Sequence, residues 1–201
     1  MNYEIGAEEL DFLKEAGNIG AGHAATALST LTGRRMDMRV PSAAILPFED
    51  IVLDDEEEAA SAVLFQLSGA LNGWMVFMLP DSQAERLARQ MTGYAAPDSP
   101  ALLQSAFAEA GNIVCGAYIS AVSDLTGKVL NLSPPQQAAD LKSVLIAEAL
   151  SAVAPEADAA LLIDACLTDD SESGGMEGSL LIVPEPDSLV ALFPPAGQSD
   201  E

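Results

Sequence analysis

Basic residues are scarce in this chain: 8 Lys and Arg stand against 31 Asp and Glu, which gives a formal net charge of −23. A surface that binds nucleic acid needs clustered Lys and Arg, and an anionic membrane surface attracts polybasic segments. The sequence has no such cluster, so we exclude both kinds of partner. The acidity favours a role in solubility, and a salty cytoplasm or a partner with a basic patch would produce the same composition.

Residue types that carry metal or nucleophilic chemistry are equally few. The one histidine, His23, makes a Ser-His-Asp set implausible, and we interpret it as an incidental helix side chain. The two cysteines, Cys115 and Cys166, are too few and too far apart for a metal cage or a disulfide framework. They are typical of small buried hydrophobic residues in a reducing compartment. We therefore expect no metal site of the chain's own.

Long uninterrupted hydrophobic runs are also missing. The first residues lack the basic segment and apolar core of a signal peptide. The most apolar long segment, 101–125, is interrupted by Gln104, Glu109, Asn112 and Asp124. It is therefore a poor membrane span and a good buried helix. We expect a cytoplasmic protein without membrane insertion, and the high hydrophobic fraction of 49% predicts a globular fold.

What the sequence does contain is an internal duplication. The residues E-A-G-N-I occupy positions 15–19 and again positions 109–113, an offset of 94 residues. The same offset relates several further positions without a gap: Asp11 to Ser105, Gly22 to Gly116, Ser29 to Ser123, and Pro41 to Pro135. Self-similarity at a fixed offset indicates repeated structural units.

Each copy of the repeat predicts the same succession of elements. A long apolar helix (7–32, then 101–126) is followed by a short strand, a β-hairpin and a further helix. In the second copy we expect an additional helix over 137–152. The pattern predicts a single α/β domain, 1–201, in which two pseudo-twofold repeats form an antiparallel-rich sheet with helices packed on it. We place the repeats at about 7–94 and 100–193, and a flexible tail at 194–201.

The repeated helix carries polar residues at positions i, i+4 and i+7, which share one helix face. We call Glu15 and Asn18 the first acid–amide pair, and Glu109 and Asn112 the second. One interpretation is structural, in which each pair is a buried polar group satisfied inside the core. The other is functional: an amide can orient a water molecule and a carboxylate can anchor a cation of a partner, which suits phosphoryl transfer. Retention of both residues in both copies favours the functional interpretation.

The spacing Asp or Ser, three residues, Glu, two residues, Asn, twenty-two residues, Pro resembles the signature of the CheC/CheX/FliY family of chemotaxis phosphatases. It runs from Asp11 to Pro41 and again from Ser105 to Pro135. Two complete copies in 201 residues are more similar to CheC than to the single-site CheX or the longer FliY. The resemblance covers nearly the whole chain.

The resemblance implies dephosphorylation of the phosphorylated response regulator CheY, a reaction of two-component signalling. Glu15 and Glu109 would pair with the regulator's active-site lysine, and Asn18 and Asn112 would orient the attacking water. Mg²⁺ would belong to the regulator, and the protein would need no cofactor of its own. The supporting motif residues are Asp11, Pro41, Ser105 and Pro135. Gly17 and Gly111 would let the regulator approach closely.

Family members can also bind the receptor deamidase CheD, and the resemblance makes Leu141, Val144 and Leu145 the candidate contacts for it. Two alternatives to the phosphatase remain. One is a non-catalytic adaptor that binds a regulator, the flagellar switch or CheD, and the other is an inert duplicated structural protein. A phosphate-release assay distinguishes them.

Overall fold

The computed structural model describes residues 6–53, 58–93, 99–151, 159–170, 175–185 and 188–193. The predicted tail, 194–201, and most of the predicted repeat boundary around 95–100 lie outside the described residues. Within the described residues, helices and strands follow in this order: α1 (Ala7–Thr32), β1 (Met36–Arg39), β2 (Ala43–Pro47), α2 (Phe48–Leu53), β3 (Ala59–Gly69), β4 (Gly73–Pro80), α3 (Asp81–Met91), α4 (Pro100–Thr126), β5 (Leu130–Leu132), β6 (Gln136–Leu141), α5 (Lys142–Ser151), β7 (Ala159–Asp169), β8 (Met176–Pro184) and a 3₁₀ turn (Val190–Leu192).

The two long helices begin and end where their sequences signal it. In α1, the backbone N–H of Gly6 donates to the Glu9 carboxylate at 2.9 Å, and α4 begins at Pro100, a residue suited to the first helical position. Both helices end at a glycine in the left-handed conformation, Gly33 at φ 65° and Gly127 at φ 67°. The predicted helix 7–32 has the observed bounds of α1, and α4 begins one residue before its predicted start.

All strand pairs in the described part of the chain are antiparallel and form one eight-stranded sheet. Its centre has the order β7-β8-β4-β3, so the hairpins of the two halves meet along β4 and β8. Strands β1 and β2 of the first half pair with β7 of the second, and β5 and β6 of the second half pair with β3 of the first. Each half therefore completes the sheet of the other.

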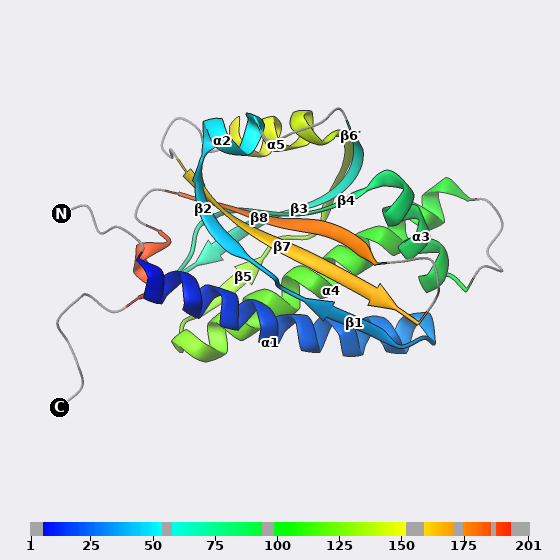
Figure 1. Cartoon of the computed structure of the whole chain (residues 1–201), viewed down its shortest axis with the longest axis horizontal. Helices are drawn as coiled ribbons and strands as arrows, with labels where there is room; N and C mark the ends of the chain where they lie inside the picture. The colour runs from blue at the N-terminus through cyan, green and yellow to red at the C-terminus, as the bar shows by residue number, and fades with distance from the viewer. Residues whose placement is uncertain are drawn as a thin grey trace.

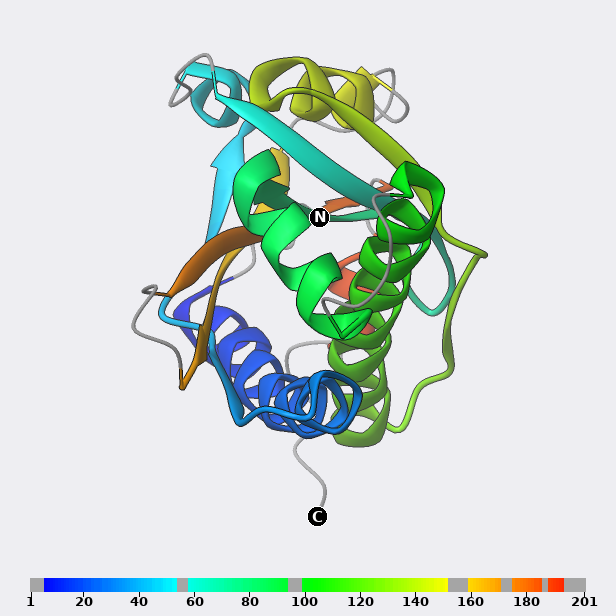
Figure 2. The same cartoon turned by 90° about the vertical axis from the view of Figure 1, so that its right-hand side faces the viewer.

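Helices cover both faces of the sheet (Figure 1), with α1 and α4 on one side and the shorter α2 and α5 on the other. Figure 2 shows α1 and α4 side by side, with α3 beside α4. The larger core lies between these three helices and residues such as Phe65, Phe77 and Ile163 of the sheet. A smaller core lies under α2 and α5. The predicted class, a mixed α/β domain with an antiparallel sheet, is confirmed.

One element differs from the sequence prediction. The helix expected over 137–152 is wrong at its beginning, because Gln136–Leu141 is strand β6 and only Lys142–Ser151 is helix α5. Residues 136–141 lack an apolar helical face, and their backbone pairs with the edge of β3. The helix is not peculiar to the second half either, because α2 occupies the corresponding place after β2. The extended segment 36–46, by contrast, is interrupted around Pro41 into β1 and β2, as a proline inside a strand predicts.

Glycines in α1 and α4 let other parts of the same chain approach. A Cβ on Gly20 would lie 2.8 Å from the Cα of Tyr118 in α4. A Cβ on Gly17 would lie 3.1 Å from Val40, and one on Gly111 would lie 2.7 Å from Val63. Both Gly17 and Gly111 are buried. The expectation that they admit the regulator is therefore wrong, because their free side faces the protein's own strands.

The contrast between Gly20 and Gly22 gives a first prediction. Gly20→Ala should lower the free energy of unfolding by about 2 kcal/mol, because the added methyl group forces α1 away from the α4 backbone. Gly22→Ala should raise it by up to about 1 kcal/mol, because no atom lies within 4 Å of its Cβ position and alanine favours helix. Urea unfolding of the two variants measures both changes, and equal effects would contradict this description of the helix crossing.

Candidate functional site

Both acid–amide pairs lie on the solvent side of their helices. Glu15 and Asn18 are exposed on α1, and Glu109 and Asn112 are exposed on α4. The opposite sides of the same turns are buried, as Leu13 and Ala110 illustrate at 1% and 0% exposure. The interpretation of the pairs as buried core groups is therefore wrong. Asp11 and Ser105, one turn before each glutamate, are exposed as well.

The first amide is anchored by the strand beside it. The backbone N–H of Val40 donates to Oδ1 of Asn18 at 3.3 Å, across 22 residues of sequence. Val40 is buried at 4% exposure and directly follows the end of β1, in the break that leads through Pro41 to β2. This bond leaves the amide nitrogen of Asn18 available to a partner. It also explains why an asparagine suits the position next to this break between strands.

The second amide has no such anchor. At the offset of 94 the counterpart of Val40 is Pro134, and proline has no backbone N–H to donate. Within the described residues, the side chain of Asn112 makes no hydrogen bond. The segment between β5 and β6 is held instead by Ser133. The Oγ of Ser133 accepts a hydrogen bond from the Gln66 N–H, and the Ser133 N–H donates to the Gln66 carbonyl, both at 2.9 Å. The two pairs thus share their spacing but differ in how their amides are held.

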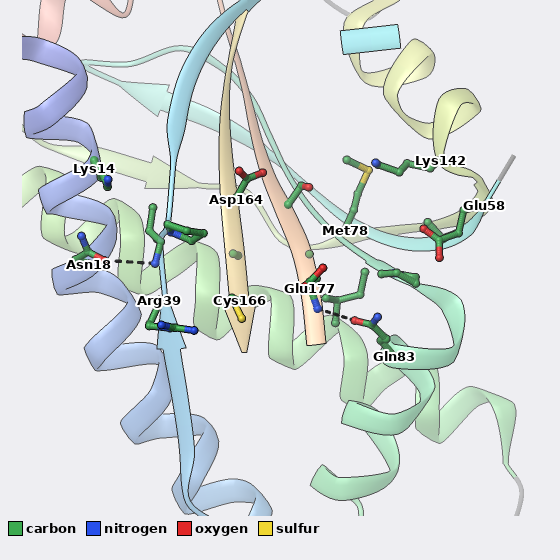
Figure 3. A pocket seen from close by; sticks show the side chains of 18 residues that line it. Lys14, Asn18, Arg39, Glu58, Met78, Gln83, Lys142, Asp164, Cys166 and Glu177 are labelled. Carbon is green, nitrogen blue, oxygen red and sulfur yellow. Dashed lines mark hydrogen bonds between the residues drawn. The ribbon is translucent and has the colours of Figure 1, made fainter. Parts of the chain in front are cut away.

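One residue of the first pair, Asn18, borders a cavity of about 910 Å³ (Figure 3). Asn18 and Pro41 line it on one side, and Glu15 does not. The floor comes from β7 and β8, with Asp164, Cys166 and Glu177 among its side chains. Asp164 accepts a hydrogen bond from the Ser42 hydroxyl, and the Glu177 N–H donates to Gln83 Oε1 at 2.8 Å.

Sequence reasoning missed the residues that surround Asn18 in this cavity. Lys14 lies one turn before Asn18 on α1, and Arg39 comes from β1, as Figure 3 shows. The repeat contains a signal that could have singled them out, because neither is repeated at the offset of 94. Their counterparts are Ala108 and Ser133.

The three residues predicted to contact a partner do not form one surface. Leu141, at the end of β6, is 37% exposed, and Val144 on α5 is half-buried. Leu145 is only 2% exposed because it packs against the sheet in the smaller core. The prediction of a partner contact through Leu145 is therefore wrong.

Neither a metal site nor a membrane span is found in the described part of the chain. No group of three or more His, Cys, Asp or Glu side chains there is arranged to hold a metal ion. Among the described helices, none combines the length and the apolar character that crossing a membrane requires.

The two free thiols lie in different environments, which gives a second prediction. Cys115 is fully buried in α4, and burial raises the pKa of its thiol far above the ordinary 9.0. Cys166 is half-buried and lines the cavity. Brief treatment of the folded protein with iodoacetamide should therefore modify Cys166 alone, and unfolding should expose both thiols. Mass spectrometry reads the sites, and equal modification of Cys115 in the folded protein would contradict its burial.

Sequence comparison relates both halves of the chain to chemotaxis proteins. A sequence model of the CheC-like family matches residues 8–45, and one of the chemotaxis phosphatase CheX matches residues 61–152. The CheY-P phosphatase CheC of Bacillus subtilis (strain 168) is 33% identical over 204 residues, which cover 97% of this chain and 97% of that protein.

Solved structures share the fold. The crystal structure of Thermotoga maritima FliY matches with a TM-score of 0.77 and 22% identity, covering 96% of each chain. The middle domain of FliM from H. pylori matches with a TM-score of 0.68 and 9% identity, covering 94% of this chain and 99% of that one. The fold is therefore that of the FliY and FliM domains. The identity to CheC over nearly the full length decides the family, and the chain belongs to the CheC-like family.

Proposed function

We propose that this protein dephosphorylates a phosphorylated CheY-like response regulator, and that each acid–amide pair completes the regulator's active site. The observation that carries the proposal is the exposure of both pairs at identical spacing on α1 and α4. The relative named CheY-P phosphatase supports the substrate class. Exposed side chains on rigid helices suit a protein that inserts groups into the site of a partner.

In the proposed reaction, the carboxylates of Glu15 and Glu109 pair with the regulator's active-site lysine. The amides of Asn18 and Asn112 hold a water molecule in line with the aspartyl phosphate. The water oxygen forms a bond to phosphorus while the bond to the aspartyl oxygen breaks, so the regulator recovers its carboxylate and inorganic phosphate leaves. Phosphoryl transfer of this kind depends mainly on positioning and on electrostatic stabilisation.

The regulator supplies the remaining chemistry. Mg²⁺ is commonly held by carboxylates together with phosphate oxygens, and in this proposal it stays with the regulator. The protein then contributes only the acid and the amide and needs no cofactor of its own. It shares the compartment of its substrate, in agreement with the expected cytoplasmic location. Leu141 and Val144 remain accessible for the proposed contact with CheD.

Phosphate release from a purified phosphorylated regulator tests the proposal. The wild-type protein, at a concentration far below that of the regulator, should release several phosphates per chain and faster than the regulator does alone. A protein that binds the phosphorylated regulator and leaves its rate unchanged would be an adaptor, and the phosphatase proposal would be wrong.

A further inference from the structure

We propose that the two acid–amide pairs are unequal, and that Lys14 and Arg39 make the first pair the electrostatic docking site for the acidic face of the phosphorylated regulator. This inference rests on the proposed function and goes beyond it. It assigns a binding role to two cations outside the repeated motif, and it predicts that the two sites differ in how they attract the same substrate.

The first observation is the placement of positive charge. The whole chain has 8 basic residues and a formal net charge of −23. Three of them, Lys14, Arg39 and Lys142, line the cavity that Asn18 also borders. Lys14 and Arg39 flank Asn18 from α1 and β1, whereas Lys142 lies across the cavity (Figure 3).

The second observation is that these two cations are not used inside the fold. Within the described residues, neither the Lys14 ammonium nor the Arg39 guanidinium makes an ion pair or a side-chain hydrogen bond. The carboxylates of the same cavity, Glu58, Asp164 and Glu177, lie beyond ion-pairing distance of both. Lys14 is half-buried and Arg39 is exposed. Both therefore remain available to an anionic group from outside.

The third observation is their absence from the second pair. The counterpart of Lys14 is Ala108, which is 8% exposed and carries no charge. The counterpart of Arg39 is Ser133, whose hydroxyl is occupied by the Gln66 backbone N–H. The repeat kept the acid and the amide in both copies but kept cations beside only one of them. A structural role common to both helices does not explain that difference.

The chemistry of the substrate explains why cations beside an acid–amide pair are useful. A regulator that holds Mg²⁺ and an aspartyl phosphate must present several carboxylates around its site. A protein with a net charge of −23 repels such a surface. Unpaired cations beside the docking residues offset the repulsion locally and raise the rate of association, an effect that weakens with added salt. The second pair has to bind the same surface without this help.

The test separates the two sites in the full-length protein. Asn112→Ala leaves only the first pair complete, and Asn18→Ala leaves only the second. With a phosphorylated regulator as substrate, kcat/KM of the first-pair protein should fall steeply as NaCl is raised from about 20 to 300 mM, and that of the second-pair protein should stay level or rise, because salt screens the repulsion between the two acidic proteins. This comparison needs no further substitution. Equal salt dependence in the two proteins would overturn the inference.

A second arm addresses the two cations directly. In the first-pair protein, Lys14→Ala with Arg39→Ser introduces the residues found beside the second pair. We expect kcat/KM at low salt to fall roughly tenfold with little change in kcat, because docking and not chemistry is weakened. The control is Arg34→Ala with Arg35→Ala in the same background, which changes net charge equally outside the cavity and should cost less than about threefold. Equal losses from the two sets would overturn the inference.

The same experiment distinguishes failure of the proposed phosphatase function from failure of the proposed inequality of the two sites. If neither single-pair protein accelerates dephosphorylation, the proposed function fails. If both accelerate it and the cations do not matter, only the inequality of the sites fails.

Discussion

Replacement of Asn18 and Asn112 together by alanine should lower the rate of catalysed phosphate release by about 10²-fold or more. The expectation follows from the role proposed for the amides, since a water molecule that is no longer held in line loses most of what the protein adds to this reaction. The fold should persist because both side chains are exposed. Among the described residues, the double substitution removes one side-chain hydrogen bond, the 3.3 Å bond from the Val40 N–H, whose loss costs about 1 kcal/mol.

The matched control for this double variant lies two turns further along the same helices. Thr26 and Ser120 correspond at the offset of 94, and both are exposed. Thr26→Ala with Ser120→Ala removes two polar side chains without touching either acid–amide pair, and its rate should stay within about twofold of the wild type. Hydrolysis that survives in the asparagine variant would show that the amides do not position water. Unfolding of that variant would restore the structural interpretation of the pairs.

Replacement of Glu15 and Glu109 by lysine should abolish complex formation with the regulator. In the proposed complex each glutamate faces a lysine, so the change turns attraction into repulsion between like charges, which costs several kcal/mol at an interface. Neither carboxylate makes an ion pair within the described residues, and the variant should therefore unfold at nearly the wild-type denaturant concentration. Calorimetric titration with a regulator loaded with beryllofluoride, a mimic of the phosphoryl group, measures the affinity.

A second pair of substitutions separates this local effect from the change in net charge. Glu8 and Asp124 are exposed on α1 and α4, and Glu8→Lys with Asp124→Lys shifts the net charge equally. This protein should bind at least as well as the wild type, because the regulator's surface is acidic. If the Glu15 and Glu109 variant binds with wild-type affinity, the carboxylates are not in the interface and the assigned role of the glutamates is wrong.

The sequence predicted well what depends on local pattern. The bounds of α1 follow from its apolar periodicity and from Gly33, and the hairpin of β3 and β4 follows from Asn72-Gly73 between two apolar runs. Exposure of the pairs follows from the same periodicity, since Glu15 and Asn18 occupy the side opposite Leu13. Each of these features is decided within a few neighbouring residues.

What the sequence did not predict depends on distant parts of the chain. Residues 136–141 became a strand because β3 offers an unpaired edge, which no local window contains. The sequence predicts Gly17 and Gly111 to admit a partner, but tertiary packing brings Val40 and Val63 of the same chain against them. The hydrogen bond from the Val40 N–H to Asn18 joins residues 22 positions apart, so no local pattern predicts it. Once this bond is known, the repeat shows that the second copy lacks it, because Pro134 stands at the position of Val40. The proposed binding role of Lys14 and Arg39 becomes apparent only in the structure, because both line the same cavity as Asn18.

The most direct test of the central claim is the rate constant for loss of the phosphoryl group from a regulator that is fully bound by an excess of this protein. Neither association nor product release contributes to that single turnover, so it reports the chemical step alone. We predict strong acceleration by the wild type and by the proteins that retain one complete pair, and a return to the regulator's own rate when Asn18 and Asn112 are both alanine. Acceleration by the double variant as large as that of the wild type would contradict the account.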